Sequence, residues 1–382
     1  MSAASILFLA LAAVGALYYI LSTAALIRHF RKAASSRLSP AKRNILKVSI
    51  LKPVRGIDSR ASENFISFMD QDYTDYEVLF GVLDENDPSV EILQDITAGK
   101  LHASIYTGSS IDGFNNKVRI LHTLFERSVG DIIAIADADT RATPDFIDRL
   151  IASFDEPNVG MVTCMYKGIN DHGIADMLEA LHMTCVFAPG VASANAMGKI
   201  DFGLGASMAV RREVIEKIGG FETIANYLAD DFQLGRKTTQ VGYDVALSDY
   251  VIDINLSGEK IAHVMQRELR WSVTTRVSRP AGHFGLIFTF GFAYALMFAA
   301  SVGFGLLGWS ILIGVSIIRL ATAYIGSVVC LGDNHFLKRA WLIPVRDLLS
   351  FAIWVAGYFK RSVTWRDRKL VLAKDGRITR VK

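Results

Sequence analysis

The sequence predicts an α/β protein with a doubly wound, largely parallel sheet and apolar segments near both ends. Two observations support this fold class. Between residues 47 and 166, short runs rich in Val, Ile and Leu alternate with segments of helical periodicity, which is typical of strands joined by crossover helices. Long stretches almost without charge lie near the N-terminus and after residue 283, and stretches of that length can cross a bilayer.

Length, charge and cysteine content narrow the class of protein. The chain has 382 residues, enough for one large or two ordinary domains. Its 41 basic residues nearly balance its 38 acidic ones and form no long stripe, so we expect no nucleic acid partner. The three Cys have no paired or metal-ligand spacing, which favours a reducing compartment.

The first apolar segment runs from Ala3 to Ile27 without a charged residue. A cleaved signal peptide would carry basic residues before its apolar run, and this segment has none there. Basic residues follow it instead: Arg28, Arg31, Lys32 and Arg37. By the positive-inside rule, the N-terminus is then outside and the chain after Arg28 begins in the cytoplasm. We expect residues 1–28 to form a transmembrane helix, followed by a polar linker from Ser35 to Asn44.

The first half of the predicted sheet follows this linker. Residues 47–56 predict a first buried strand that ends in Pro and Gly, and we expect a helix around Ala61–Met69 behind it. A second strand is predicted over residues 76–83 and a short third one from His102 to Tyr106. A helix with apolar residues at helical spacing opens at Asn115.

The next predicted strand, residues 130–136, ends at two acids, Asp137 and Asp139. Alternate residues of an extended segment point the same way, so the two carboxylates can share one target. A divalent cation on a diphosphate is the natural one, and ligands of open α/β sheets bind at this end of the strands. A lone Asp-x-Asp is more often a polar strand end or turn. Its interpretation as a site therefore depends on the other motifs.

The pattern changes beyond a further strand at Val159–Tyr166. Residues 182–198 contain no Asp, Glu, Lys or Arg, but Pro189 and its neighbouring Gly interrupt them. They fit a segment that touches the membrane or an acceptor and equally a buried core segment. Residues 203–210 predict a strand of small residues, where another group approaches the backbone closely. A helix over residues 211–218 follows and ends at two glycines.

Two apolar regions lie near the C-terminus. The stretch Phe284–Leu331 is interrupted only by Arg319 and is long enough for two spans joined by a turn near residues 303–308. Arg319 is costly in a bilayer, so it should face protein, water or lipid headgroups. The stretch Trp341–Tyr358 is shorter and carries one Arg and one Asp, so it is either a marginal span or an interfacial segment.

Charged landmarks stand at the ends of several predicted elements. Asp84 alone fits a solvated loop acid, Asp230 and Asp231 fit helix N-caps, and the segment around Trp271 fits an interfacial anchor. Their order along the chain is what supports a common site.

In this order the motifs resemble those of the inverting, family 2-like glycosyltransferases, and within them the ceramide glucosyltransferase-like group, which includes bacterial hopanoid-modifying glycosyltransferases. The resemblance covers nearly the whole chain. It is carried by Val48–Gly56, Asp84–Pro88, Asn116–Val118, Asp137–Asp139, Leu228–Phe232, Arg267–Trp271 and Trp365–Arg366.

The resemblance implies the nucleotide-diphospho-sugar transferase fold of the GT-A type, a doubly wound mixed sheet with N- and C-terminal transmembrane helices. We accordingly expect a cytoplasmic glycosyltransferase domain over residues 45–280. A membrane region of two or three apolar segments would occupy residues 281–360, and a basic tail residues 361–382. The protein would be an integral membrane protein, in the inner membrane if bacterial.

Carried over residue by residue, the resemblance also implies roles for four acids. Asp84 would contact the nucleotide, and Asp137 would bind the donor beside it. Asp139 would hold Mg²⁺ or Mn²⁺ on the UDP diphosphate. Asp231 would be the general base. Some ceramide-type members lack the second acid of the Asp-x-Asp element, so the presence of Asp139 supports the metal and loosens the tie to those members.

Four further residues match cationic or aromatic positions of the family. Arg267, Arg270 and Trp271 fit its (Gln/Arg)-x-x-Arg-Trp motif at the diphosphate and acceptor side. Lys117 fits a substrate-binding position, although the family has Asn-Pro-Lys where this chain has Asn-Asn-Lys.

Chemistry supports this reading of the motifs. A departing UDP develops negative charge, which a divalent cation and guanidinium groups stabilise. A hydroxyl is a poor nucleophile, so one carboxylate must accept its proton, and a single displacement on an α-linked UDP-sugar gives a β-glycoside. Because the Arg-Trp motif shortly precedes an apolar region, we expect a membrane lipid as acceptor, ceramide-like or hopanoid. The sugar is a hexose or N-acetylhexosamine, from UDP-glucose or UDP-N-acetylglucosamine.

Two other functions fit the same motifs. A processive polysaccharide synthase would need enough spans to line a pore, and three or four are few. A non-catalytic membrane protein that only binds nucleotides would not need Asp231.

Overall fold

The computed structural model describes residues 1–37, 46–360, 362–365 and 368–381. The predicted linker Ser35–Asn44 lies mostly outside these residues, and so does Arg366. The chain divides into two compact units. The sheet unit comprises Arg37–Asp171 and Met197–Ser257, and the helical unit comprises Met1–Ser36, His172–Ala196 and Gly258–Lys382. The domain limits predicted from the sequence stay predictions; the two compact units divide the predicted domain 45–280 between them.

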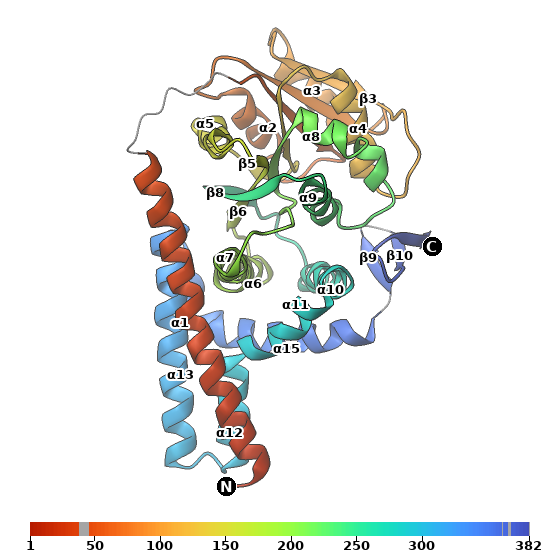
Figure 1. The fold of residues 1–382 in the computed structure, drawn as a ribbon. Coiled ribbons are helices and arrows are strands. Elements are labelled where there is room, and N and C mark those ends of the chain that lie inside the picture. Colours follow the sequence, from red (N-terminus) through yellow and green to blue (C-terminus); the bar gives the residue numbers. More distant parts are fainter. Residues whose placement is uncertain (38–45, 361, 366–367, 382) are drawn as a thin grey trace. The chain divides into compact units, whose positions relative to one another are not determined.

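The sheet unit is built on an eight-stranded mixed sheet in the order β3-β2-β1-β4-β7-β6-β8-β5 (Figure 1). The strands β1, β2, β3 and β4 run parallel, β7 is antiparallel to both β4 and β6, and β5 is antiparallel to β8. The strands are β1 (Val48–Val54), β2 (Tyr76–Val82), β3 (Ala103–Thr107), β4 (Ile132–Ala136), β5 (Thr140–Arg141), β6 (Val159–Ile169), β7 (Ser207–Arg211) and β8 (Asp244–Asn255). The predicted doubly wound mixed sheet is therefore confirmed.

The helices of this unit include those predicted around Ala61–Met69, from Asn115 and over residues 211–218. The helices are α2 (Ala61–Met69), α3 (Ser89–Thr97), α4 (Asn116–Arg127), α5 (Phe146–Ile151), α8 (Arg212–Lys217) and α9 (Asp230–Gln240). Helix α3 was not predicted, because its sequence begins inside an acidic loop. The strand expected over residues 203–210 begins only at Ser207, after a glycine-rich approach.

The centre of the sheet forms the core, as the apolar runs predict. Every residue of β1 and β4 is buried. The aromatic rings of Phe65 and Phe80 meet edge to face at 5.5 Å, and those of Phe68 and Phe146 at 5.4 Å. Burial of such apolar surface is the main stabilising term of the fold, and it fixes the strand ends that carry the acids.

The helical unit contains most of the remaining elements. Its helices are α1 (Ala3–Arg37), α6 (Ile174–His182), α7 (Ala188–Met197), α10 (Ile261–Ser278), α11 (Pro280–Gly285), α12 (Gly291–Ser301), α13 (Leu306–Tyr324), α14 (Phe336–Arg339) and α15 (Ile343–Phe359). A small antiparallel sheet of β9 (Ser362–Trp365), β10 (Arg368–Leu372) and β11 (Ile378–Val381) closes the chain.

Among the described residues, four helical stretches are long and apolar enough to cross a membrane. They are Ala3–Lys32, Ile174–Met197, Leu306–Cys330 and Phe336–Phe359. A fifth candidate is the pair Pro280–Thr289 and Gly291–Ser301, bent by 51°. The predicted turn between the C-terminal spans is confirmed at Gly303 and Phe304, which both have positive φ.

The stretch 182–198 differs from its prediction. It continues as a helix through Pro189, which the sequence analysis treated as an interruption. One wide π-helical segment, Met183–Phe187, precedes the proline and accommodates its missing N–H group. The 24 residues Ile174–Met197 are therefore long and apolar enough to cross a membrane, where the sequence predicted a broken segment.

Candidate active site

The Asp-x-Asp element lies in the turn between β4 and β5. Strand β4 ends at Ala136, and the chain turns at once, so Asp137 and Asp139 do not lie on an extended strand as predicted. The backbone carbonyl of Asp137 accepts a hydrogen bond from the Thr140 hydroxyl at 2.6 Å, which closes the turn. The two carboxylates are therefore held by turn geometry and not by strand alternation.

Lys117 links this turn to the start of α9. Its Nζ lies 2.6 Å from Asp137 Oδ1 and 3.7 Å from Asp230 Oδ2. It also donates a hydrogen bond to the carbonyl of Gly205 at 3.1 Å. Asp137 and Asp230 raise the pKa of Lys117 above its ordinary value, against the opposing effect of burial. The ammonium group is thus charged and shared between acids from two distant segments.

Asn115 also connects α4 to the start of α9, and it was not selected as a site residue from the sequence. Its side-chain oxygen caps α4 by accepting from the backbone N–H groups of Lys117 and Val118. Its amide group donates to the Tyr227 carbonyl at 2.9 Å and to Asp230 Oδ1 at 3.2 Å. Its position before a helical run predicts an N-cap. Its contact with Asp230 could not be predicted from the neighbouring sequence.

Asp231 stands in the first turn of α9, next to Asp230. Its Oδ1 accepts a hydrogen bond from the backbone N–H of Phe232 at 2.8 Å. A Cβ atom placed on Gly205 would lie 3.1 Å from Asp231 Oδ2, so a glycine allows this close approach. The close backbone approach predicted for residues 203–210 is therefore confirmed.

The surroundings of Asp231 favour a proton acceptor of moderate strength. Burial raises the pKa of Asp231 to about 6, and the negative charge of Asp230 adds to this, while Lys117 opposes it. A carboxyl group with a pKa near the operating pH is suited to general base catalysis.

Lys52 is a second residue that the sequence analysis did not select. It is fully buried at the end of β1. Its Nζ donates to the Asp137 carbonyl at 2.8 Å and lies 3.7 Å from the centre of the Phe68 ring. Burial lowers the pKa of Lys52 to about 7, although Asp139 and Asp137 act in the opposite direction. A lysine inside an otherwise apolar strand is the signal that would have identified it.

Asp84 lies at the end of β2, where it is exposed. Its Oδ1 accepts from the backbone N–H of Asn86 at 3.0 Å. The neighbouring Asp87 accepts from the Gly56 N–H at 2.9 Å and so joins the loops after β1 and β2. Because β2, β1 and β4 are parallel neighbours, Asp84 lies at the same edge of the sheet as the Asp-x-Asp turn.

The donor set fits a cation held together with a phosphate. Among the described residues, no three His, Cys, Asp or Glu side chains lie close enough to hold a metal ion by themselves. Mg²⁺ sites of nucleotide enzymes commonly use one or two carboxylates and substrate phosphates. Asp137 is engaged by Lys117. The expected binding of a cation by Asp139 stays a prediction.

The Arg-Trp motif belongs to the helical unit, on α10. Arg267 forms ion pairs with Glu179 and, at 2.8 Å, with Glu259. The guanidinium of Arg270 lies 6.0 Å from the centre of the Trp365 ring. The Trp271 ring stacks on His182 with 5.9 Å between the ring centres. The expected place of the motif at the diphosphate stays a prediction.

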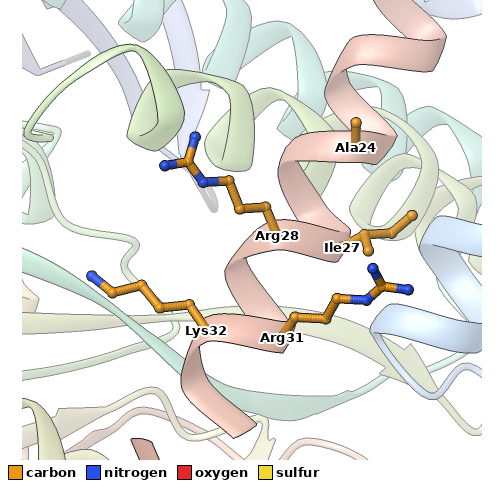
Figure 2. A pocket seen from close by; sticks show the side chains of 5 residues that line it. All are labelled: Ala24, Ile27, Arg28, Arg31 and Lys32. Carbon is orange, nitrogen blue, oxygen red and sulfur yellow. The ribbon is translucent and has the colours of Figure 1, made fainter. Parts of the chain in front are cut away.

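A basic hollow of about 500 Å³ lies at the end of α1. Figure 2 shows its five lining side chains, which all come from this helix: Ala24, Ile27, Arg28, Arg31 and Lys32. The three cations follow directly on the apolar part of the helix and are exposed. This order suits a helix end at a membrane surface.

Comparisons with known proteins agree with this geometry. The model of glycosyl transferase family 21 matches residues 7–378. The chain is 23% identical to ceramide glucosyltransferase 3 of Caenorhabditis elegans, over 87% of this chain and 74% of that protein. It is also 23% identical to ceramide glucosyltransferase 1 of the same organism, over 87% of this chain and 72% of that protein.

A solved structure shares the fold. The mannosyltransferase PcManGT from Pyrobaculum calidifontis, in complex with GDP-Man and Mn²⁺, aligns over 91% of this chain and 99% of its own, with a TM-score of 0.50 and 17% identity. The match of the family model over nearly the whole chain settles the assignment. The chain belongs to glycosyl transferase family 21 and is a glycosyltransferase.

Proposed function

We propose that the protein is a membrane-bound inverting glycosyltransferase that moves a hexose or N-acetylhexosamine from a UDP-sugar to the hydroxyl group of a membrane lipid. The observation that carries this proposal is the cluster in which Lys117 joins Asp137 to Asp230, with Asp231 beside them. The turn proposed to bind the donor and the carboxylate proposed as the base lie together in this cluster, as a direct transfer between two substrates requires.

Asp231 is the general base of the reaction. Its carboxylate accepts the proton of the acceptor hydroxyl while the hydroxyl oxygen bonds to C1 of the sugar. The bond between C1 and the phosphate oxygen breaks in the same step, and UDP leaves with the electron pair. One displacement inverts C1, so an α-linked donor gives a β-glycoside. The raised pKa of Asp231 makes its carboxylate a stronger base than an ordinary Asp.

The donor side uses the remaining acids and cations. Asp84 contacts the nucleotide, and Asp139 holds Mg²⁺ or Mn²⁺ together with the diphosphate. The cation, when bound, neutralises charge that develops on the leaving UDP. Lys117 orients Asp137, and Lys52 holds the carbonyl of the same turn. The bound GDP-Man and Mn²⁺ of the mannosyltransferase with this fold support a nucleotide sugar and a divalent metal.

The acceptor is a membrane lipid, and a ceramide-like lipid is the better supported of the two expected acceptors. Two similar proteins that cover most of this chain are ceramide glucosyltransferases. A hopanoid polyol presents the same chemistry, a hydroxyl group on an apolar body, and remains the alternative. Several helices that could span a membrane provide a place for either lipid.

The site faces the cytoplasm in this proposal. Nucleotide sugars are made there, and the cations at the end of α1 favour the cytoplasmic side by the positive-inside rule. In a bacterium the protein would lie in the inner membrane.

One experiment tests the function directly. Membranes that contain the protein are incubated with radiolabelled UDP-glucose or UDP-N-acetylglucosamine, and the labelled product is extracted and identified. We expect one labelled lipid that carries a single sugar. A labelled polymer would instead support a processive synthase. Label that binds to the protein without entering any product would support a non-catalytic nucleotide-binding protein.

A further inference from the structure

Ion pairs connect four helices of the helical unit in series, α6, α10, α15 and α13. Figure 1 labels these four helices. The pairs are Glu179–Arg267, Glu268–Arg346 and Arg319–Asp347. The first two use neighbouring residues of α10, and the last two use neighbouring residues of α15. Each helix is thereby tied to the next, and the series passes through the Arg-Trp motif.

The central pair is held most firmly. Arg346 and Glu268 form two parallel bonds of 2.6 and 2.7 Å, and their exposed fractions are 0% and 2%. Arg346 also contacts the carbonyl of Leu178 in α6, at 3.4 Å. One guanidinium therefore fixes α15 against both α10 and α6. A planar fork suits this task, and a lysine would lose the paired geometry.

A second contact between α15 and α10 lies on the other side of the motif. The Ser272 hydroxyl donates to the carbonyl of Ile353 at 3.4 Å. A Cβ atom on Gly357 would lie only 2.4 Å from Ser272 Oγ, so the absence of a side chain there lets the two helices meet. Glu268 and Ser272 bracket Arg270 and Trp271 in the sequence, so both residues lie between two fixed points of α10.

Arg267 is likewise held by contacts with carboxylates. Its Nε donates to Glu179 Oε1 at 2.8 Å, and a second nitrogen atom pairs with the other carboxylate oxygen. Its third nitrogen atom lies 2.8 Å from Glu259 Oε2. These two acids raise the pKa of Arg267, although burial alone would lower it. All three guanidinium nitrogens therefore have carboxylate partners.

We infer that Arg267 and Arg346 are positioning residues, which orient α10 so that Arg270 and Trp271 are presented for the transfer reaction. This inference rests on the proposed function, because it gives α10 a part in glycosyl transfer. Within the motif, Arg267 then holds the helix, and the role expected at the diphosphate is left to Arg270. The buried Arg and Asp that made the last apolar stretch a doubtful span are then parts of this support.

A matched pair of conservative variants tests the inference. Arg346→Lys keeps the charge of the central pair and removes its fork. Arg339→Lys makes the same change in another fully buried pair of this unit, with Asp333 at 3.1 Å, which lies outside the series. The full-length variants are purified in lipid nanodiscs. Thermal unfolding, the dissociation constant for UDP and the kcat for transfer from a UDP-sugar to lipid are measured for each.

The positioning role predicts a split between the two variants. Arg346→Lys should lower kcat by about tenfold or more while its UDP affinity stays within about twofold of the wild type. Arg339→Lys should keep the kcat of the wild type, even if its unfolding temperature falls as far as that of Arg346→Lys. A kcat of Arg346→Lys close to that of the wild type, or equal losses in both variants, would overturn the inference.

A second comparison separates the two arginines of the motif. Arg267→Lys should act as Arg346→Lys does, on kcat alone, whereas Arg270→Lys should weaken UDP binding. A weaker UDP affinity of Arg267→Lys would show instead that Arg267 contacts the diphosphate. The wild type provides the remaining control: no transfer by the wild type contradicts the proposed function, and transfer by the wild type with unaffected Lys variants contradicts the inference alone.

Discussion

The two units use buried charge in opposite ways. In the helical unit the three pairs that link the helices each join one guanidinium to one carboxylate, and Arg267 also contacts the carboxylate of Glu259. In the sheet unit two lysines, Lys52 and Lys117, lie among four aspartates. The aspartates are Asp137, Asp139, Asp230 and Asp231. The charges of the three linking pairs cancel, whereas these four aspartates outnumber the two lysines.

This difference distinguishes support from chemistry. A balanced buried pair satisfies its own electrostatics and mainly fixes geometry. An excess of carboxylates is costly until a cation arrives or a proton is taken up, so it marks a place for a ligand or a reaction. Variants of the sheet cluster should therefore change turnover, donor binding or pH dependence, whereas variants of the balanced pairs should first change stability or helix orientation.

The largest effect is expected for Asp231→Asn. The amide keeps the shape of the side chain but cannot accept the acceptor's proton, so kcat should fall by about a thousandfold. The dissociation constant for UDP should stay near that of the wild type. Transfer kinetics and UDP titration of the same preparation check both statements. An active Asp231→Asn protein would show that the base lies elsewhere.

Arg319→Leu tests one of the ion pairs that link the helices of the helical unit. It leaves Asp347, which is 6% exposed, without the guanidinium that contacts it at 2.7 and 2.8 Å. Loss of one partner of a buried pair costs about 3–5 kcal/mol. The double variant Arg319→Leu/Asp347→Leu should recover much of this loss, as measured by unfolding in detergent. If the single variant were as stable as the wild type, the pair would not be a structural support.

Asp139→Ala should weaken donor binding and leave the fold intact. Without this carboxylate the divalent cation has one protein ligand fewer, so we expect about a hundredfold loss of metal-dependent UDP-sugar affinity. Binding is measured with Mn²⁺ and again with a chelator. Equal affinities of variant and wild type under both conditions would remove Asp139 from the metal site.

Gly205→Ala probes the close approach beside the base. The new Cβ atom would lie 3.1 Å from Asp231 Oδ2 and must displace that carboxylate by a few tenths of an ångström. We expect kcat to fall by about tenfold, with little change in UDP affinity. Gly173, where a Cβ atom would have open space, provides a matched control for Gly→Ala. Equal kcat values for the two variants would contradict the geometry.

The smallest expected effect is a shift of the pH profile by Asp230→Asn. Asp231 must be deprotonated to act, so activity should fall as the pH drops through its pKa of about 6. Removal of the neighbouring negative charge lowers this pKa, and the acid limb of kcat/KM should move to lower pH. A limb that stays in place, or moves to higher pH, would show that another group controls it.

Much of the fold could be predicted from local pattern. The buried runs of β1 and β4 and the bounds of α2 follow from apolar periodicity, which local sequence reports directly. The direction of β7 could not be predicted in this way, because antiparallel pairing depends on the path of the chain after residue 170. Helix α3 could not be predicted for a local reason: its apolar face is small, and its sequence begins in an acidic loop.

The site was predictable in its acids and less so in their partners. Asp137 and Asp231 stood in recognisable motifs, but the bond from Asn115 to Asp230 joins residues 115 positions apart. Lys52 meets the Asp-x-Asp turn only because β1 and β4 are neighbours in the sheet. In the same way, Arg319 and Asp347 are each costly in an apolar segment when considered alone. Their ion pair makes both compatible with burial.

The central claim is that one carboxylate, Asp231, takes the acceptor's proton in a single displacement. The anomeric configuration of the sugar in the purified glycolipid product, determined by NMR after reaction with an α-linked UDP-sugar, tests this claim most directly. The account predicts a β-linkage. An α-linkage would mean that the configuration is retained, and it would contradict the mechanism.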